Sequence, residues 1–174
     1  MEPRSLSRLE PRSSRPDFAL GYGIDRSLVE GLLPWSFVTE RMAGSRNYWV
    51  ATTRPGGRPH VMPVWGLWLD DAFFFSTDPK SRKGRNLAAN PEVVVHLESG
   101  DEAVVFEGIA ERVTERPVLE RFADAYDAKY QFRPDPTNPA QGVYRLNART
   151  VFAWTEKDFL TTTTRWLFAP TPSE

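Results

Sequence analysis

The chain has 174 residues, and its 22 Lys and Arg against 23 Asp and Glu give a formal net charge of −1. This balance argues against a protein that binds nucleic acid over its whole surface, because such proteins carry an excess of basic residues. The sequence has no cysteine and two histidines, which excludes disulfides and a cysteine nucleophile and makes a typical zinc or iron site unexpected. No run approaches the roughly 18 apolar residues of a membrane helix. We expect a soluble globular protein without a resident metal.

The first thirty residues are predicted to form an N-terminal arm, and residues 31–174 one folded domain. Residues 1–16 hold four arginines, three prolines and four serines, with few sizeable apolar side chains. Such a segment cannot bury enough apolar surface to offset the entropy of ordering it. We expect the arm to be flexible or draped over a partner subunit. It contains no apolar stretch typical of a secretory signal, so a cytoplasmic location is expected.

Alternating apolar residues, helical spacing and turn residues predict mainly antiparallel β-structure with a few short helices. Turns rich in glycine, proline and aspartate join neighbouring strands, which makes a small closed or split β-barrel the natural architecture. In chain order, the predicted elements are a helix at 35–44, strands at 48–53, 58–69 and 72–77, a helix at 80–90, strands at 92–98 and 103–114, a helix at 117–130, and strands at 143–146, 151–155 and 162–168.

The second predicted strand, residues 58–69, is apolar on both of its faces. It is therefore expected to be buried on both sides or to lie against a ligand. Pro59 and Pro63 cannot donate to a β-ladder, which places part of the strand at an edge or a bulge. The backbone groups left free at such an edge can bind another molecule.

The segment 76–85 carries four cations against one carboxylate, and two hydroxyl residues stand at its start. Cations in the first turn of a helix are locally unfavourable, whereas the free amides there attract anions. The pattern therefore indicates an anion site, most simply for a phosphate, with a solvated basic face as the alternative. The candidate phosphate-binding residues are Ser76, Thr77, Ser81, Arg82 and Lys83.

No side chain stands out in the sequence as a catalytic acid, base or nucleophile. It contains no phosphate-cradling glycine loop, nucleophile elbow or zinc motif. His60 and Tyr48 are weak candidates for a proton donor, and His96 fits a core histidine in a valine-rich strand. A phosphate site beside a flat apolar strand, without catalytic side chains, suggests that a bound cofactor supplies the chemistry.

Three stretches in this order, 57–65, 73–77 and 81–91, resemble the pyridoxamine 5'-phosphate oxidase-like split-barrel superfamily. Within this superfamily, the Pro-Val-Trp strand and residues 164–168 are more similar to the flavin- and deazaflavin-dependent oxidoreductases than to the true pyridoxamine phosphate oxidases. Where the true pyridoxamine phosphate oxidases have Leu-Leu-Lys, this chain has Val64, Trp65 and Gly66, so vitamin synthesis is not expected.

The resemblance implies a split β-barrel of the FMN-binding type and a homodimer with two cofactors in clefts between the subunits. It assigns the cofactor phosphate to Lys83, helped by the other candidates named above. It assigns the substrate side to Arg165 and Trp166, either of the same subunit or of the other one. The tricyclic ring would be lined by the backbone of Met62, Pro63, Val64 and Trp65.

We therefore expect an oxidoreductase that transfers hydride between the 8-hydroxy-5-deazaflavin coenzyme (factor 420) and a small conjugated or heteroaromatic substrate. One alternative is an FMN-dependent oxidase or reductase on the same barrel. The other is a non-catalytic module that binds a flavin, haem or tetrapyrrole. Neither nucleic acid nor a membrane is expected as a partner.

Overall fold

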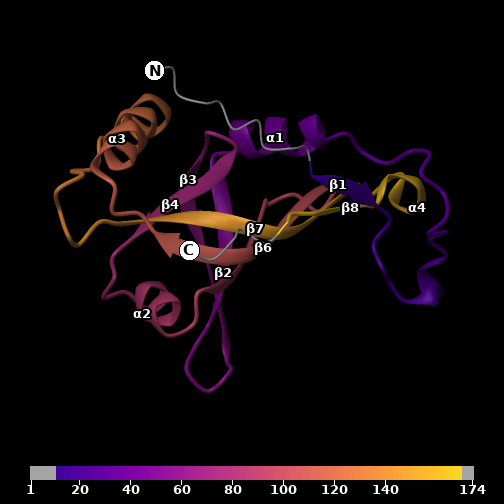
Figure 1. The fold of residues 1–174 in the computed structure, drawn as a ribbon, viewed down its shortest axis with the longest axis horizontal. Helices are drawn as coiled ribbons and strands as arrows, with labels where there is room; N and C mark the ends of the chain where they lie inside the picture. Colours follow the sequence, from indigo (N-terminus) through magenta and orange to yellow (C-terminus); the bar gives the residue numbers. More distant parts are fainter. Residues whose placement is uncertain (1–10, 170–174) are drawn as a thin grey trace.

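The computed structural model describes residues 11–169, and its elements follow the predicted order (Figure 1). The strands are β1 (Arg12–Ser14), β2 (Asn47–Thr53), β3 (Pro59–Leu69), β4 (Ala72–Thr77), β5 (Glu92–His96), β6 (Glu102–Arg112), β7 (Gly142–Thr155) and β8 (Thr164–Leu167). The helices are the 3-10 turn η1 (Leu20–Tyr22), α1 (Trp35–Gly44), α2 (Arg82–Ala89), α3 (Arg116–Tyr130) and α4 (Phe159–Thr162). None of these helices is long and apolar enough to span a membrane.

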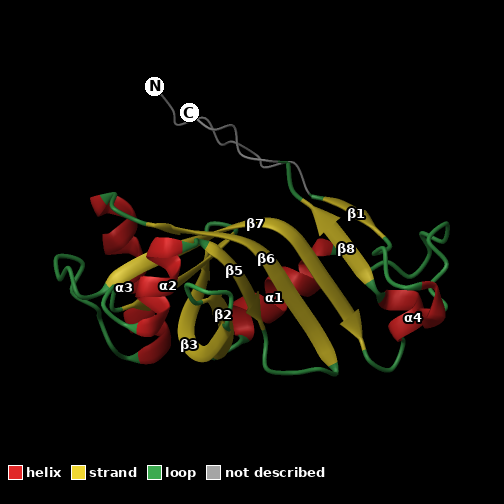
Figure 2. Cartoon of the chain, turned by 90° about the horizontal axis from the view of Figure 1, so that it is seen from below, coloured by secondary structure: helices red, strands yellow, loops and turns green. Residues whose placement is uncertain are grey.

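Six antiparallel strands close into a barrel in the order β7-β4-β3-β2-β5-β6, because β7 pairs with both β4 and β6. Strands β8 and β1 extend the sheet beyond β7 (Figure 2). The register of β6 against β7 shifts at Gly108, where a Cβ atom would lie 2.2 Å from the Asn147 carbonyl oxygen. Glycine therefore allows the close approach at this bulge. The predicted fold class is confirmed.

Three consecutive phenylalanines in β4 divide the hydrophobic core into two parts. Successive side chains of a strand point to opposite faces. Phe73 and Phe75 therefore pack inside the barrel, whereas Phe74 packs outside it against α3. There it meets Phe122 at a ring distance of 6.4 Å. This second cluster fixes α3 against β3 and β4 (Figure 1).

The two strands predicted at 143–146 and 151–155 are one continuous strand, β7. The polar residues between them interrupt the apolar alternation, which is why the sequence suggested a break. Their backbone nevertheless stays paired with β6, with Ala148 opposite Gly108 and Thr150 opposite Glu107. A β-ladder is held by backbone groups, so side-chain polarity on an open face does not end it.

The last predicted strand, 162–168, begins later than expected, at Thr164. The helical turn α4 precedes it, and threonine hydroxyls stabilise that turn. The Thr162 hydroxyl donates to the Asp158 carbonyl oxygen at 2.8 Å, and the Thr163 hydroxyl donates to that of Phe159. Such local bonds let β-branched residues continue a helix against their intrinsic preference.

The first ten residues of the predicted arm lie outside the described part of the chain. From Arg12 onward the arm forms β1, which pairs with β8 of the same chain. The Arg15 side chain is buried, and its guanidinium donates to the carbonyl oxygens of Leu28, Glu30 and Thr163 at 3.0, 2.5 and 2.9 Å. Residues 12–16 of the arm are therefore packed on the chain's own sheet, whereas most of residues 17–30 are exposed. Its contact with a partner subunit stays a prediction.

Candidate functional site

The first half of β3 is an exposed apolar edge in the single chain. Residues 59–65 pair with β2, whereas β4 pairs with β3 only from Gly66 onward. The prediction that the prolines mark an edge is confirmed. The prediction that the whole strand is buried on both sides, one of the two alternatives given for it, was wrong. Val61, Met62 and Trp65 are 46%, 50% and 39% exposed. A ligand or a second protein surface therefore remains as the covering for this edge.

The barrel opens where β3 and β4 separate. The last paired residues are Gly66 and Phe75, so Trp65 and Ser76 flank the opening. Beyond it, the Thr77 and Ser81 hydroxyls are 3.1 Å apart. Ser81 caps α2 by accepting the Gly84 amide at 3.0 Å. The strand of the predicted ring site and the hydroxyls of the predicted phosphate site thus lie at one opening.

Lys83 is the most unusual side chain at this opening. The residue is 7% exposed, and it makes no hydrogen bond or ion pair within residues 11–169. Burial lowers the pKa of its ammonium group to about 8. The first turn of α2 contains no acidic residue, and the adjacent Arg82 is exposed. A largely buried cation without a counter-charge in the described part of the chain is costly, so this position suits an incoming anion.

A buried polar contact joins α2 to β2 behind Lys83. The Asn86 side-chain amide donates to the Thr52 hydroxyl at 2.9 Å, and both residues are almost fully buried. The Asn86 Oδ1 atom is buried with no partner in the described structure. Asn86 and Thr52 were missed in the sequence analysis. The available signal was the three-residue spacing of Lys83 and Asn86, which places them on one helix face.

His60, a weak catalytic candidate, lies at the margin of the same site. It is opposite Thr52 in the β2–β3 ladder and is partly buried. Burial, followed by the charges of Arg54, Lys83 and Arg82, lowers the pKa of its imidazole. Its neutral form is therefore favoured when no anion is present.

An aromatic stack terminates the other end of the exposed edge. Trp65 stacks on Tyr130 of α3 with ring centroids 4.7 Å apart and planes 5° from parallel. The Tyr130 hydroxyl accepts the Gly66 amide at 3.0 Å and donates to the Arg46 carbonyl oxygen at 2.7 Å. The Arg46 guanidinium lies 5.3 Å from the Trp65 ring centre. Tyr130 and Arg46 were missed because only the fold brings α3 to this strand.

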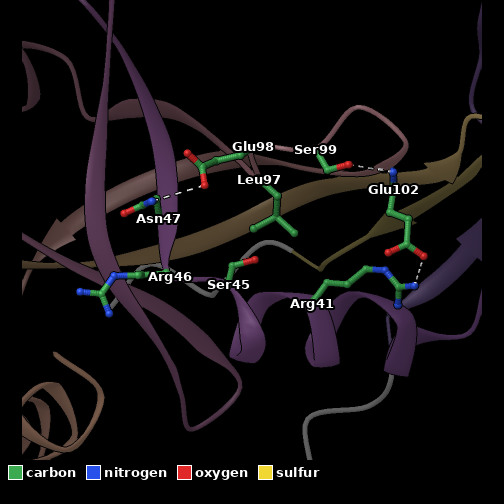
Figure 3. A pocket seen from close by; sticks show the side chains of 8 residues that line it. All are labelled: Arg41, Ser45, Arg46, Asn47, Leu97, Glu98, Ser99 and Glu102. Atoms are coloured by element: carbon green, nitrogen blue, oxygen red, sulfur yellow. Dashed lines mark hydrogen bonds and ion pairs between the residues drawn. The ribbon is translucent and has the colours of Figure 1, made fainter.

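A small cavity of about 270 Å³ lies beyond Trp65, at the start of β2 (Figure 3). Asn47, which is opposite Trp65 in the ladder, donates to Glu98 there at 3.4 Å. Arg41 and Glu102 form an ion pair across the cavity wall. The wall is therefore charge-balanced, unlike the opening at Lys83. It is lined by Arg41, Ser45, Arg46, Asn47, Leu97, Glu98, Ser99 and Glu102.

Tyr48 does not fit the role of a proton donor to a ligand. Its side chain is fully buried, and its hydroxyl donates to the carbonyl oxygens of Met42 and Ser45. Lys129 donates to the same hydroxyl at 2.9 Å. Burial raises the pKa of Tyr48 far above its usual value. This candidate role is corrected: Tyr48 connects α1, β2 and α3.

Trp166 lies in the core of this chain, and its substrate-side role stays a prediction. Trp166 is 1% exposed and packs edge-on against Trp35 at a ring distance of 5.5 Å. Strand alternation directs it into the core, opposite Val151 of β7. Arg165 points the other way and donates to the Ser14 hydroxyl at 3.2 Å. Strands β7 and β4 separate β8 from the exposed edge of β3.

Within residues 11–169, no group of three or more His, Cys, Asp or Glu is arranged to hold a metal ion. The site therefore consists of a cationic helix start, two paired hydroxyls and an apolar strand edge ending in an aromatic stack. This combination can hold an anionic group at one end and a flat apolar group at the other.

A profile of the pyridoxamine 5'-phosphate oxidase family matches residues 37–155. The chain belongs to this family. Pyridoxine/pyridoxamine 5'-phosphate oxidase from Gluconobacter oxydans (strain 621H) is 40% identical to it over 82 residues. That match covers 45% of this chain and 38% of the relative, so it spans less than half the length of either protein.

Solved structures show the same fold. A conserved hypothetical protein from Mycobacterium tuberculosis is 26% identical, with a TM-score of 0.63 over 75% of this chain and 90% of that one. An F420 reductase is 22% identical, with a TM-score of 0.52 over 64% and 94%. A heme binding protein from Mycobacterium smegmatis is 19% identical, with a TM-score of 0.54 over 75% and 62%.

Proposed function

We propose that this chain is a deazaflavin-dependent oxidoreductase, which transfers hydride between the 8-hydroxy-5-deazaflavin coenzyme and a small conjugated or heteroaromatic substrate. The observation that carries the proposal is Lys83, a largely buried lysine without a counter-charge among residues 11–169, at the start of a cationic helix. A phosphate would satisfy this group, and the coenzyme carries one. The fold shared with an F420 reductase supports this choice of cofactor.

The described residues fit such a cofactor at both of its ends. Lys83 and Arg82 would hold the phosphate with the nearby hydroxyls, through charge-assisted hydrogen bonds. The exposed edge of β3 would face the tricyclic ring, since its backbone and apolar side chains are uncovered in the single chain. The proposed contacts are Ser76, Thr77, Ser81, Arg82 and Lys83 for the phosphate, and Met62, Pro63, Val64 and Trp65 for the ring.

The protein's own contribution is binding, orientation and exclusion of water. When bound, the deazaflavin supplies the ring carbon that gives or accepts hydride. The exposed backbone edge of residues 62–65 would lie beside that ring, and the Tyr130 stack keeps the Trp65 side chain in place. Tyr48 takes no part in proton transfer, because its hydroxyl is used inside the fold.

A homodimer with a cofactor at each subunit interface is part of the proposal. Val61, Met62 and Trp65 are large apolar side chains on one strand edge, and all three are more than a third exposed in the single chain. Val61 and Trp65 share one face of β3 and Met62 lies on the other, so both faces of this edge expose apolar side chains, which is typical of an interaction site. A second copy would cover what the cofactor leaves open, as the sequence resemblance implies.

Two alternatives have their own support. The same residues would hold FMN, and membership of the pyridoxamine 5'-phosphate oxidase family favours an FMN-dependent oxidase or reductase. A non-catalytic module that binds flavin, haem or tetrapyrrole is supported by the heme binding neighbour and by the lack of an accessible acid or base at the ring end.

Titration of the purified protein with the deazaflavin coenzyme and with FMN, followed by fluorescence, separates these functions. Micromolar or tighter binding of the deazaflavin alone supports the proposal, and preference for FMN favours the first alternative. If the protein binds neither cofactor, the proposed function is contradicted. Turnover with reduced cofactor and an electron acceptor then excludes the non-catalytic module. If no acceptor tested gives turnover, the non-catalytic module is favoured.

A further inference from the structure

Gly66 is the residue at which β3 changes its partner strand. The ladder with β2 ends at Trp65, and the ladder with β4 begins at Gly66. A Cβ atom at Gly66 would lie 2.5 Å from the Phe73 ring, so the position requires glycine. The exposed edge of residues 59–65 ends here. A group that fixes Gly66 therefore also fixes the end of that edge.

Two consecutive residues of α3 hold both backbone polar groups of Gly66. The Lys129 ammonium group donates to the Gly66 carbonyl oxygen at 3.2 Å, and the Tyr130 hydroxyl accepts the Gly66 amide at 3.0 Å. Tyr130 also stacks on Trp65, the residue before Gly66. The last turn of α3 therefore takes the place of a neighbouring strand at the point where β2 stops pairing.

Lys129 joins this point of β3 to two further elements. Its ammonium group donates to the Tyr48 hydroxyl of β2 at 2.9 Å and to the Ala43 carbonyl oxygen of α1 at 3.5 Å. The three hydrogens of the ammonium group thus have three oxygen acceptors, one each from β3, β2 and α1. Within residues 11–169 none of these partners is a carboxylate, and burial, followed by the charge of Arg46, lowers the pKa of Lys129 to about 8. The charge is therefore held in unfavourable surroundings by the hydrogen bonds that it donates.

We propose that Lys129 is a positioning residue of the cofactor site. By fixing Gly66 against α1 and β2, it sets the position of the backbone edge at residues 62–65. This inference rests on the proposed function, in which that edge lies beside the cofactor ring. Lys129 acts on the ring end alone, because the residues proposed for the phosphate come from β4 and α2, which it does not contact.

Hydrogen–deuterium exchange of the full chain without cofactor tests the positioning step. Lys129→Met keeps an unbranched side chain but removes the donated hydrogen bonds. We expect the amides of residues 64–67 to exchange at least about tenfold faster, as in local opening, while those of α2 keep their wild-type rates. Lys157→Met, on the exposed surface, is the control and should exchange as wild type does.

The pattern of exchange decides between positioning and overall stability. Unchanged exchange at residues 64–67 would overturn the inference. An equal acceleration throughout the chain would show a role in stability alone and would also overturn it. Lys129→Gln, which retains donor hydrogens, is the milder second variant should Lys129→Met not fold, and the same local acceleration is expected of it.

Cofactor affinity supplies the second readout. Each cofactor is titrated beside its phosphate-free form, which is riboflavin for FMN and the deazariboflavin for the deazaflavin coenzyme. Lys129→Met should weaken both forms by the same factor, about tenfold, which is the effect of one charge-assisted hydrogen bond. The ratio of the two affinities should stay as in wild type, whereas Lys83→Ala should change it.

The outcomes separate this inference from the proposed function. Unchanged affinity of Lys129→Met for both forms, or a loss confined to the form with the phosphate, would overturn the role of Lys129 while leaving the phosphate site. Failure of the wild-type protein to bind either cofactor overturns the proposed function and this inference with it.

Discussion

Lys83 is held in surroundings that disfavour its own charge. Burial lowers its pKa from the usual 10.5 of a lysine to about 8. Natural proteins keep such groups at functional sites at a cost in stability. The sequence identified Lys83 by the unusual cations at a helix start, and the structure adds that it has no described partner.

Replacing Lys83 by methionine should therefore stabilise the cofactor-free protein. The unfolded chain holds more protons than the folded chain between pH 8 and 10.5, so wild-type stability rises with pH across that range. Lys83→Met should raise the free energy of unfolding by about 1–2 kcal/mol at pH 7, after allowance for solvent screening. The gain should shrink between pH 8 and 10.

Thermal unfolding at pH 7 and pH 10 measures this difference. The matched control is Lys80→Met on the exposed surface beside α2, which should change stability by less than about 0.5 kcal/mol. Equal stability of Lys83→Met and wild type at pH 7 would show that the ammonium is compensated within the protein.

Thr52→Val tests the buried contact between β2 and α2. The change keeps the shape but leaves the Asn86 amide without its acceptor. An unsatisfied buried donor costs about 1–3 kcal/mol, so the free energy of unfolding should fall by that amount. Urea denaturation measures it, with Thr53→Val as the control on the neighbouring, less buried position. A loss no larger than that of the control would contradict the assigned contact.

The Thr52–Asn86 contact shows where residue-level reasoning from the sequence ends. The charge pattern identified Arg82 and Lys83 because an unfavourable helix start is visible locally. Thr52 and Asn86 are 34 positions apart, and only the packing of α2 on β2 brings them together. For the same reason the aromatic partner of Trp65 could not be found from its own strand.

Among the elements, β1 is held by its ladder with β8 and by the arginine that follows it. Arg15 makes three hydrogen bonds, to the backbone carbonyl oxygens of Leu28, Glu30 and Thr163. Arg15→Ala should lower the free energy of unfolding by about 1.5–3 kcal/mol, the range for hydrogen bonds of charged groups. Arg12→Ala, exposed on the same strand, should have little effect. Urea unfolding of both variants measures this difference. An equally small loss of stability for Arg15→Ala and Arg12→Ala would show that the Arg15 hydrogen bonds do not anchor the arm.

Element boundaries followed the sequence where apolar alternation and turns coincide. Strand β4 and helix α1 end where their turn residues predicted. The sequence analysis wrongly predicted two strands in place of β7, because the middle of β7 carries polar side chains on an open face. Its backbone ladder continues through these residues. β1 gave no apolar signal at all, since its packing depends on Arg15.

The whole molecule leaves an apolar edge that one chain does not cover. If a second copy covers it, the wild-type protein should sediment as a dimer. Val61→Lys places a charge at that edge and should weaken dimerisation at least about tenfold, equivalent to about 1.4 kcal/mol. Leu160→Lys is the control, since Leu160 is an exposed apolar residue on α4, outside both the arm and β3. A monomeric wild type in sedimentation velocity would contradict the proposed interface.

The barrel and the position of its opening were predictable from the sequence, because alternation and the order of motifs determine both. The orientation of Trp166 was not predictable from the sequence, because the strand alternation that builds the barrel directs this side chain into the core. A side chain's direction in a short strand depends on register, and register comes from pairing.

The central claim is that Lys83 binds the phosphate of a flavin-type cofactor. Fluorescence titration with FMN and with the deazaflavin coenzyme, on wild type, Lys83→Ala and the exposed control Lys157→Ala, tests it most directly. We predict that Lys83→Ala weakens binding by about 1.5–3 kcal/mol, roughly tenfold to 150-fold, whereas Lys157→Ala binds as wild type does. Equal affinity of Lys83→Ala and wild type for both cofactors would contradict the account.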